Sequence, residues 1–314
     1  MRFPLRLLGL IAAPHTPMNS DGSLNPAMIP AQAQLLRESG VRGAFICGTT
    51  GESLSLTVSE RVAVTEAWCE ALTPSPSPSA RGDSEAMPIV VHVGSNSLLE
   101  ARVLAGHAAQ CGVSAIAAMA PSFFKSSLDE LIAYCAAVAD AAPNTPLYYY
   151  DIPTMTNAPI PTARFLEQAA KTIPTLHGIK FTNNDLMTLQ ECLALDAFDI
   201  VFGYDELLLA GLALGVRGAV GSTYNFAAPI YQRLIDAFER GDLASARAAQ
   251  LQSVRMIRVL QEYGFSRASK AMMRLVGVNC GPVRLPLKPM TDVEIRELCA
   301  RLQGVEGFSR PLQV

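Results

Sequence analysis

Lys180 stands inside an apolar run, Gly178–Phe181 (GIKF), that has the composition of a buried strand. Side chains alternate along a strand, so Lys180 faces away from Ile179 and Phe181. A charged amine in a dry interior is costly, and such a lysine loses its proton, finds a partner or extends toward solvent. The uncharged amine can form a Schiff base with a ketone. Lys180 is therefore a candidate for covalent chemistry, the alternative being a lysine that only reaches the mouth of the fold.

Other apolar runs also end in groups that could do chemistry. At least one tyrosine of Leu147–Tyr150 (LYYY) must point into the interior, where a buried phenol requires a hydrogen-bond partner. The loop Gly48–Ser53 (GTTGES) has hydroxyls and backbone N–H groups that can hold an anion. The structural alternatives are plain packing for the tyrosines and an ordinary strand-to-helix turn for the loop. Paired acids in Gly203–Glu206 (GYDE) and hydroxyls in Gly221–Asn225 (GSTYN) could bind substrate hydroxyls or cap helices.

Eight short apolar runs recur along the chain, and most are separated by stretches with helical periodicity. This pattern predicts an α/β fold, a (β/α)8 TIM barrel with a C-terminal helical extension, and places the active site at the carboxyl ends of the strands. The predicted strands are Leu8–Ala13, Gly43–Cys47, Ile89–Val93, Ser114–Ala118, Leu147–Tyr150, Gly178–Phe181, Asp199–Phe202 and Gly218–Val220. The predicted helices are Asn25–Ser39, Val58–Leu72, Leu98–Cys111, Leu128–Ala141, Leu186–Leu195, Ile230–Phe238, Ala244–Tyr263 and Val293–Leu302.

A doubly wound sheet is the competing architecture, and it usually carries a glycine-rich phosphate loop after its first strand. Here residues 14–17 read PHTP, so that loop is missing. We therefore expect residues 1–225 to form the barrel and residues 226–314 to add the eighth barrel helix and the extension, as one structural unit.

Two segments need separate interpretation. Residues 1–13 (MRFPLRLLGLIAA) resemble a short signal peptide, but the strand count favours a buried first strand at Leu8–Ala13. Leu72–Pro88 is rich in proline and serine, which predicts an exposed, partly mobile loop.

Composition excludes several classes of protein. The 314 residues are 50% hydrophobic and 17% charged, with a net charge of −3 at pH 7, so the chain is neither disordered nor a typical nucleic-acid binder. No apolar run is long enough to span a bilayer. The seven cysteines are scattered without a C-x-x-C pair and the four histidines are dispersed, which favours buried free thiols in a reducing cytoplasm over disulfides or a metal site.

Three motifs together resemble the dihydrodipicolinate synthase/N-acetylneuraminate lyase superfamily of class I aldolases. They are GTTGE at Gly48–Glu52, Y-x-I-P at Tyr150–Pro153 and GIKFT at Gly178–Thr182. The resemblance covers nearly the whole chain, and residues 203–206 and 221–225 are similar to the sialic acid lyase branch.

The resemblance implies a role for each candidate residue. Lys180 would form the Schiff base with a 2-oxo acid, and Tyr150 would shuttle a proton at the carbon–carbon bond that breaks or forms. Thr49 and Thr50 would hold the pyruvyl carboxylate. The residues expected to contact the sugar-derived chain are Thr182, Gly203, Asp205, Glu206 and Ser222. No metal or cofactor is expected, and the family is usually tetrameric.

Two departures from the synthase branch favour the lyase branch. Pro153–Thr156 lacks the arginine that would bind a second substrate carboxylate, and Ala120–Lys125 lacks the tyrosine that the synthases send into a neighbouring subunit. The missing tyrosine also weakens the proton relay to Tyr150, for which Thr49 or a water could substitute.

The expected reaction is therefore reversible cleavage of N-acetylneuraminate to pyruvate and N-acetylmannosamine by a cytoplasmic homotetramer. The alternatives are dihydrodipicolinate synthase, another pyruvate-dependent aldolase or dehydratase of 2-keto-3-deoxy sugar acids, and a non-catalytic sugar-acid binding protein.

Overall fold

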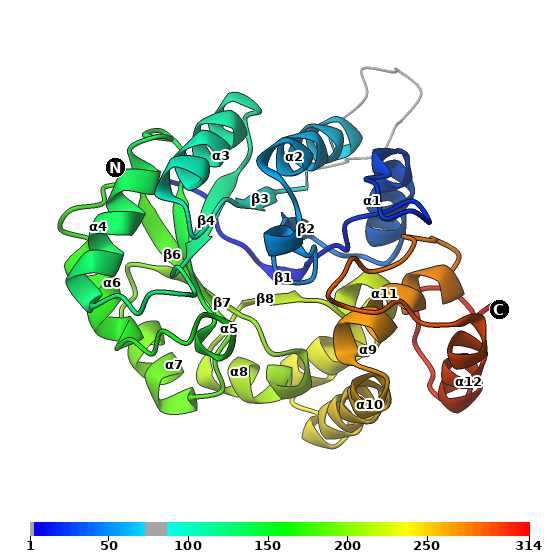
Figure 1. Ribbon diagram of the computed structural model, residues 1–314. Coiled ribbons are helices and arrows are strands. Elements are labelled where there is room, and N and C mark those ends of the chain that lie inside the picture. The colour runs from blue at the N-terminus through cyan, green and yellow to red at the C-terminus, as the bar shows by residue number, and fades with distance from the viewer. Residues whose placement is uncertain (1–2, 73–86) are drawn as a thin grey trace, which may run out of the picture.

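A closed barrel of eight parallel strands forms the centre of the molecule (Figure 1). The computed structural model describes residues 3–72 and 87–314, so most of the proline- and serine-rich segment lies outside the described residues. Each strand pairs with the next along the chain, and β8 pairs with β1 to close the barrel. The strands are β1 (Gly9–Ala12), β2 (Gly43–Ile46), β3 (Ile89–His92), β4 (Ala115–Met119), β5 (Leu147–Asp151), β6 (Leu176–Phe181), β7 (Asp199–Phe202) and β8 (Gly218–Gly221).

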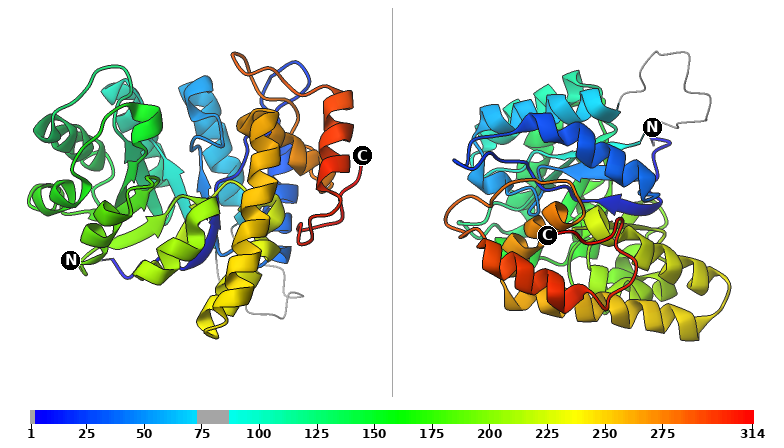
Figure 2. Two further views of the ribbon diagram at one scale, coloured as in Figure 1. Left: turned by 90° about the horizontal axis from the view of Figure 1, so that it is seen from below. Right: turned by 90° about the vertical axis from the view of Figure 1, so that its right-hand side faces the viewer.

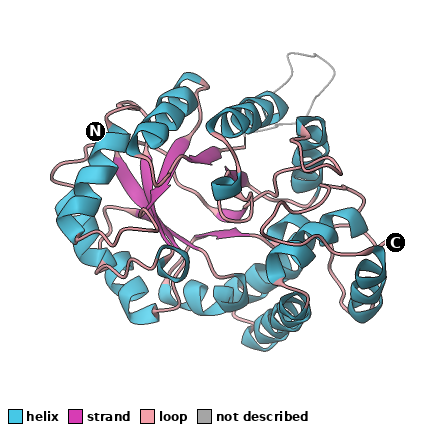
Figure 3. Cartoon of the chain, in the orientation of Figure 1, coloured by secondary structure: helices cyan, strands magenta, loops and turns pink. Residues whose placement is uncertain are grey.

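The predicted (β/α)8 barrel is thus confirmed, and each strand lies within two residues of its predicted bounds. Helices surround the barrel as an outer layer (Figure 3). They are α1 (Ile29–Glu38), α2 (Val58–Leu72), α3 (Leu98–Gln110), α4 (Leu128–Ala139), α5 (Pro153–Thr156), α6 (Thr162–Ala169), α7 (Leu186–Leu193), α8 (Leu208–Leu214) and α9 (Tyr224–Glu239), followed by α10 (Leu243–Glu262), α11 (Phe265–Leu275) and α12 (Asp292–Leu302). Short 3-10 turns, η1 (Pro26–Met28), η2 (Ser53–Ser55) and η3 (Asp205–Leu207), precede or connect some of them.

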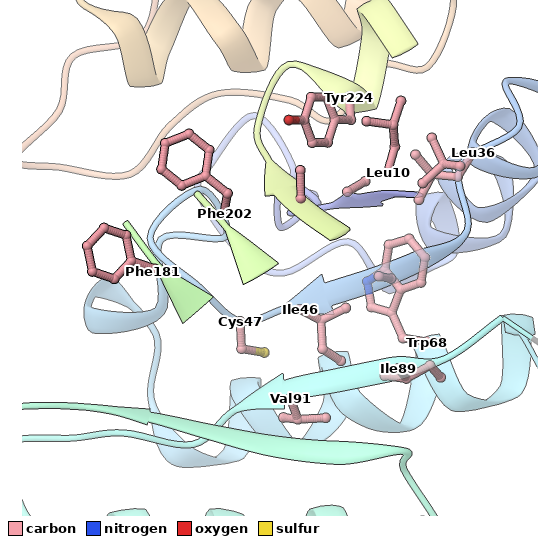
Figure 4. Packing of buried hydrophobic residues seen from close by; sticks show 14 of the residues in the cluster. Leu10, Leu36, Ile46, Cys47, Trp68, Ile89, Val91, Phe181, Phe202 and Tyr224 are labelled. Carbon is pink, nitrogen blue, oxygen red and sulfur yellow. The ribbon is translucent and has the colours of Figure 1, made fainter. Parts of the chain in front are cut away.

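Side-chain alternation divides the buried residues into two cores. One core fills the barrel with Phe45, Tyr148, Val201 and Val220, whereas the other lies between the strands and the helices. Figure 4 shows part of the second core, where Trp68 of α2 faces strands β2 and β3. Both cores are continuous because strands covered on two sides can be apolar at every position.

The N-terminal segment closes the amino end of the barrel. Leu7 belongs to the interior core, and its backbone N–H donates to Asp199 Oδ2 at 2.9 Å. The same carboxylate oxygen accepts a hydrogen bond from Tyr148 Oη at 2.6 Å, and His177 Nε2 lies 2.6 Å from the carbonyl oxygen of Leu5. The predicted buried first strand is confirmed as β1, and the residues before it plug the barrel.

The last helices gather on one flank of the barrel. Helix α10 packs against α9, and α12 packs against both α10 and α11 (Figure 2). Within the described ranges, no helix has the length and apolar character needed to cross a bilayer.

Most cysteines are buried as predicted. Cys47, Cys135, Cys192, Cys280 and Cys299 are buried free thiols, whereas Cys69 and Cys111 are only partly buried and pack against the edge of the core.

Candidate active site

A cavity of about 230 Å³ lies at the carboxyl ends of the barrel strands. All the candidate residues that the sequence singled out line it, although they come from five different strand ends or the loops that follow them. They are Thr49, Thr50, Tyr150, Lys180, Thr182, Gly203, Asp205, Glu206 and Ser222. The closed barrel brings these residues together because every parallel strand ends at the same rim.

Lys180 rises from β6 into the barrel and is 5% exposed. Its Nζ lies 3.7 Å from the ring centroid of Tyr150 and 4.7 Å from that of Phe45. No carboxylate of the described residues forms an ion pair with this amine. Lys180 therefore meets two aromatic faces and the cavity, an arrangement that leaves its nitrogen open to a ligand.

Tyr150 is fixed on several sides. Its ring packs edge-on against Phe45 and His92, with centroids 5.4 and 5.6 Å away. Its hydroxyl lies 3.2 Å from Thr49 Oγ1. Thr49 is one of the two substitutes that the sequence suggested for the missing tyrosine of the proton relay, the other being a water. Burial lowers the pKa of His92 well below its ordinary value, which makes this neighbour a neutral ring.

The GTTGE loop is held rigidly beside Tyr150. Thr50 Oγ1 lies 2.6 Å from Ser222 Oγ, which links the loop after β2 to the loop after β8. Glu52 has a left-handed backbone (φ 56°), and its buried side chain forms an ion pair with Lys270 Nζ of α11 at 2.7 Å. The other carboxylate oxygen of Glu52 accepts the backbone N–H of Arg284 at 2.8 Å. The hydroxyls of Thr49 and Thr50 are therefore presented on an anchored backbone.

The opposite wall carries a buried acid. Burial raises the pKa of Asp205 to about 7, although hydrogen bonds from the hydroxyl and backbone N–H of Thr223 oppose that shift. Gly203 and Gly221 have no side chains, and this leaves space for the side chains of Thr182 and Asp205 in this wall. A Cβ on Gly221 would collide with Asp205 Oδ1, and a Cβ on Gly203 would collide with Thr182 Oγ1.

Several cavity residues escaped sequence reasoning. The C-terminal helices contribute Ile257, Gln261, Phe265, Ser266 and Ser269, so the extension is part of the cavity wall. The barrel strands and the loops after them add Ala13, His15, Ile152, Thr154, Met155, Tyr204, Val220 and Gly221. Helix α11 was not predicted from the sequence, and its buried face includes the polar residues Ser269 and Lys270.

The two departures from the synthase pattern have structural counterparts. Pro153–Thr156 forms the short helix α5, and its Thr154 and Met155 line the cavity without a cation. Phe123 and Phe124 are 81% and 79% exposed and pack edge-on against each other, away from the cavity lining. In residues 3–72 and 87–314, no three His, Cys, Asp or Glu side chains are grouped so that they could hold a metal ion.

Residues 6–304 match the model of the dihydrodipicolinate synthetase family. The chain belongs to this family. Mouse N-acetylneuraminate lyase is 40% identical over 319 residues, covering 99% of this chain and 97% of that protein.

Solved structures of the same family agree with this placement. The N-acetylneuraminate lyase of Proteus mirabilis is 39% identical with a TM-score of 0.90, covering 96% of this chain and all of that chain (100%). A lysine-bound synthase from Cyanidioschyzon merolae is 26% identical with a TM-score of 0.83, covering 94% and 97% of the two chains. The family assignment made from GTTGE, Y-x-I-P and GIKFT is therefore confirmed.

Proposed function

We propose that the protein is a class I aldolase that reversibly cleaves N-acetylneuraminate to pyruvate and N-acetylmannosamine. The observation that carries the proposal is the buried amine of Lys180, which opens into the cavity with Tyr150 Oη and Thr49 Oγ1 beside it. The relatives named N-acetylneuraminate lyase, at about 40% identity over nearly the whole chain, support the choice of substrate.

The proposed mechanism begins when Lys180 Nζ attacks the ketone carbon of the open-chain sugar acid and water leaves. The resulting iminium withdraws electrons from the bond between its α and β carbons, the second of which carries a hydroxyl. Tyr150 takes the proton of the β-carbon hydroxyl while its own phenolic proton passes along the hydrogen bond to Thr49, so that the bond breaks and the amino sugar leaves as an aldehyde. The enamine then gains a proton at carbon, and hydrolysis releases pyruvate and the free lysine.

Substrate binding divides between two walls in this proposal. The hydroxyls and backbone N–H groups of Thr49 and Thr50 hold the pyruvyl carboxylate, since donors on a fixed backbone suit an anion. The sugar-derived chain contacts the wall formed by Thr182, Gly203, Asp205, Glu206 and Ser222. None of the described residues that line the cavity is an arginine, which favours a sugar acid over a substrate with a second carboxylate.

Borohydride reduction in the presence of pyruvate tests the chemistry. We expect one reduced pyruvyl group on the peptide that contains Lys180 and none in Lys180→Ala. Lys171→Ala, which removes an exposed lysine, is the matched control and should be labelled normally. Cleavage activity retained in Lys180→Ala would refute the mechanism.

A substrate panel tests the specificity. We expect cleavage of N-acetylneuraminate, and no condensation of aspartate semialdehyde with pyruvate. Cleavage of a 2-keto-3-deoxy sugar acid alone would replace the proposed substrate, and binding without turnover would support the non-catalytic alternative.

We also propose that the protein is a cytoplasmic homotetramer. The buried free thiols are compatible with a reducing compartment. Large exposed apolar side chains, among them Leu99, Phe123 and Phe124, provide surface that partner copies could cover. Light scattering should give a mass about four times 33.6 kDa.

A further inference from the structure

Helix α10 lies outside the barrel but contacts the segment that carries Asp205. Gln250 Nε2 donates to the backbone carbonyl of Asp205 at 3.1 Å, and Gln250 Oε1 accepts the backbone N–H of Leu209 at 2.8 Å. One side chain of α10 thus joins η3 to the start of α8. The backbone of Asp205 is held from the C-terminal extension.

A second connection runs from α10 to the carboxylate of Asp205. Ser253 Oγ lies 2.7 Å from Tyr231 Oη, Tyr231 Oη lies 2.6 Å from Thr223 Oγ1, and Thr223 Oγ1 lies 2.6 Å from Asp205 Oδ2. The side chains of Thr223, Tyr231 and Ser253 are completely buried. An ionised carboxylate only accepts, so Thr223 gives its single proton to Asp205. Tyr231 then donates to Thr223, and Ser253 donates to Tyr231.

This chain of hydroxyls fixes one oxygen of Asp205 and leaves the other available. Both hydrogen bonds from Thr223 reach Oδ2, and no other hydrogen bond of similar geometry reaches the carboxylate from the described residues, although the buried hydroxyl of Tyr224 also interacts with it. Tyr231 packs edge-on against Tyr224 at 4.7 Å, a contact that a phenylalanine would make equally well. The ring of Tyr231 therefore supplies packing, and its hydroxyl helps to orient the carboxylate of Asp205.

We infer that Tyr231 and Ser253 are positioning residues for substrate binding, which act through Thr223 to hold Asp205 Oδ2 so that Oδ1 faces the polar chain of the substrate. The inference rests on the proposed function for the identity of that substrate. It extends the binding site to two residues, on α9 and α10, that do not line the cavity.

The charge state of Asp205 gives a second readout. The charged and titratable groups that face it are Glu206, Lys180, Tyr224 and Tyr231. Thr223 lowers the pKa of Asp205 by hydrogen bonding. Without the Tyr231 hydroxyl, Thr223 is a weaker donor, because hydrogen bonds in a chain polarise one another. The pKa of Asp205 should then rise further.

The test compares Tyr231→Phe and Ser253→Ala with Tyr148→Phe. Like Tyr231→Phe, the control removes a buried tyrosine hydroxyl, but this one bonds Asp199 directly and lies at the opposite end of the barrel. For Tyr231→Phe we expect KM for N-acetylneuraminate to rise about fivefold with kcat changed less than about twofold, and Ser253→Ala should shift KM in the same direction by less. Borohydride trapping of pyruvate should be unchanged in every variant.

A carbon-13 NMR titration of the Asp205 carboxyl, assigned with Asp205→Asn, makes the test independent of turnover. The midpoint should move to higher pH in Tyr231→Phe and stay in place in Tyr148→Phe. An unchanged midpoint, or an unchanged KM in an enzyme that does cleave N-acetylneuraminate, would overturn the inference. If the wild type traps no pyruvate, the proposed function fails, and the titration alone decides whether Tyr231 controls Asp205.

Discussion

The amine of Lys180 lies over the rings of Tyr150 and Phe45, and these rings give it an apolar surround with one open side. Tyr150 has two separate parts in this arrangement. Its ring forms the surface under the amine, whereas its hydroxyl is bonded to Thr49. A variant can therefore remove the proton-transfer group and keep the environment of the lysine.

Tyr150→Phe should lower kcat by about 10²- to 10⁴-fold, the usual contribution of general acid–base catalysis. Schiff-base formation with pyruvate should persist, because the ring beneath Lys180 remains. Steady-state cleavage and borohydride trapping measure the two effects. Thr49→Val, which removes only the partner hydroxyl, should cost less. A Tyr150→Phe enzyme with more than half the wild-type kcat would contradict the role given to the phenol.

Asp205 should make substrate affinity depend on pH. Burial raises its pKa to about 7, so the carboxylate is present above that pH and becomes protonated as the pH falls through it. A protonated acid is a weaker acceptor for substrate hydroxyls. We expect KM for N-acetylneuraminate to rise by about an order of magnitude from pH 7.5 to pH 5.5. In Asp205→Asn, KM should be high and flat over this range, and a flat wild-type profile would contradict the prediction.

At the scale of elements, α11 connects the C-terminal helices to the catalytic rim. It contributes Phe265, Ser266 and Ser269 to the cavity, and Lys270 on the same helix anchors the GTTGE loop through Glu52. The side chains of this ion pair are 1% and 5% exposed. Such a pair is costly to break because the remaining charge has no solvent.

Lys270→Met should therefore destabilise the fold by about 3–5 kcal/mol. Arg301→Met is a matched control, since it breaks the ion pair between Arg301 and Glu262 on the surface, where a much smaller loss is expected. Denaturant unfolding monitored by circular dichroism gives both values. Adding Glu52→Gln to Lys270→Met should restore part of the loss. Equal effects of the two single variants would show that burial does not govern this pair.

Periodicity and motifs predicted the strands and nine of the cavity residues, because those residues lie where a parallel strand ends. Helices α5, α6, α8 and α11 were not predicted. Helix α6 is short, α8 (LLAGLAL) is apolar on all sides and includes a glycine, and α11 hides a buried lysine. The partner of Glu52 is 218 residues away, so no local signal could reveal it.

At the scale of the whole molecule, the residues before β1 close the amino end of the barrel and should contribute to its stability. Leu7 is 1% exposed within the interior core, whereas its neighbour Leu8 is 43% exposed. The two leucines provide a direct comparison of the same substitution inside and outside the barrel.

Leu7→Ala should destabilise the protein by about 2–5 kcal/mol, because it removes buried methyl groups and leaves a cavity among residues that cannot fully collapse. Leu8→Ala should change stability by no more than about 0.5 kcal/mol. Chemical denaturation measures both. Similar losses in the two variants would mean that the segment does not seal the barrel as described.

The contact between Lys270 and Glu52 also bears on protein synthesis. When all eight strands have been translated, α11 has not yet been made, and α11 is the helix that holds the loop after β2 in place. Nascent chains that end before residue 265 therefore hold every residue proposed for imine chemistry but lack part of the wall and its anchor. Catalytic competence should emerge only after residues 265–275 have been translated and α11 docks onto the loop after β2.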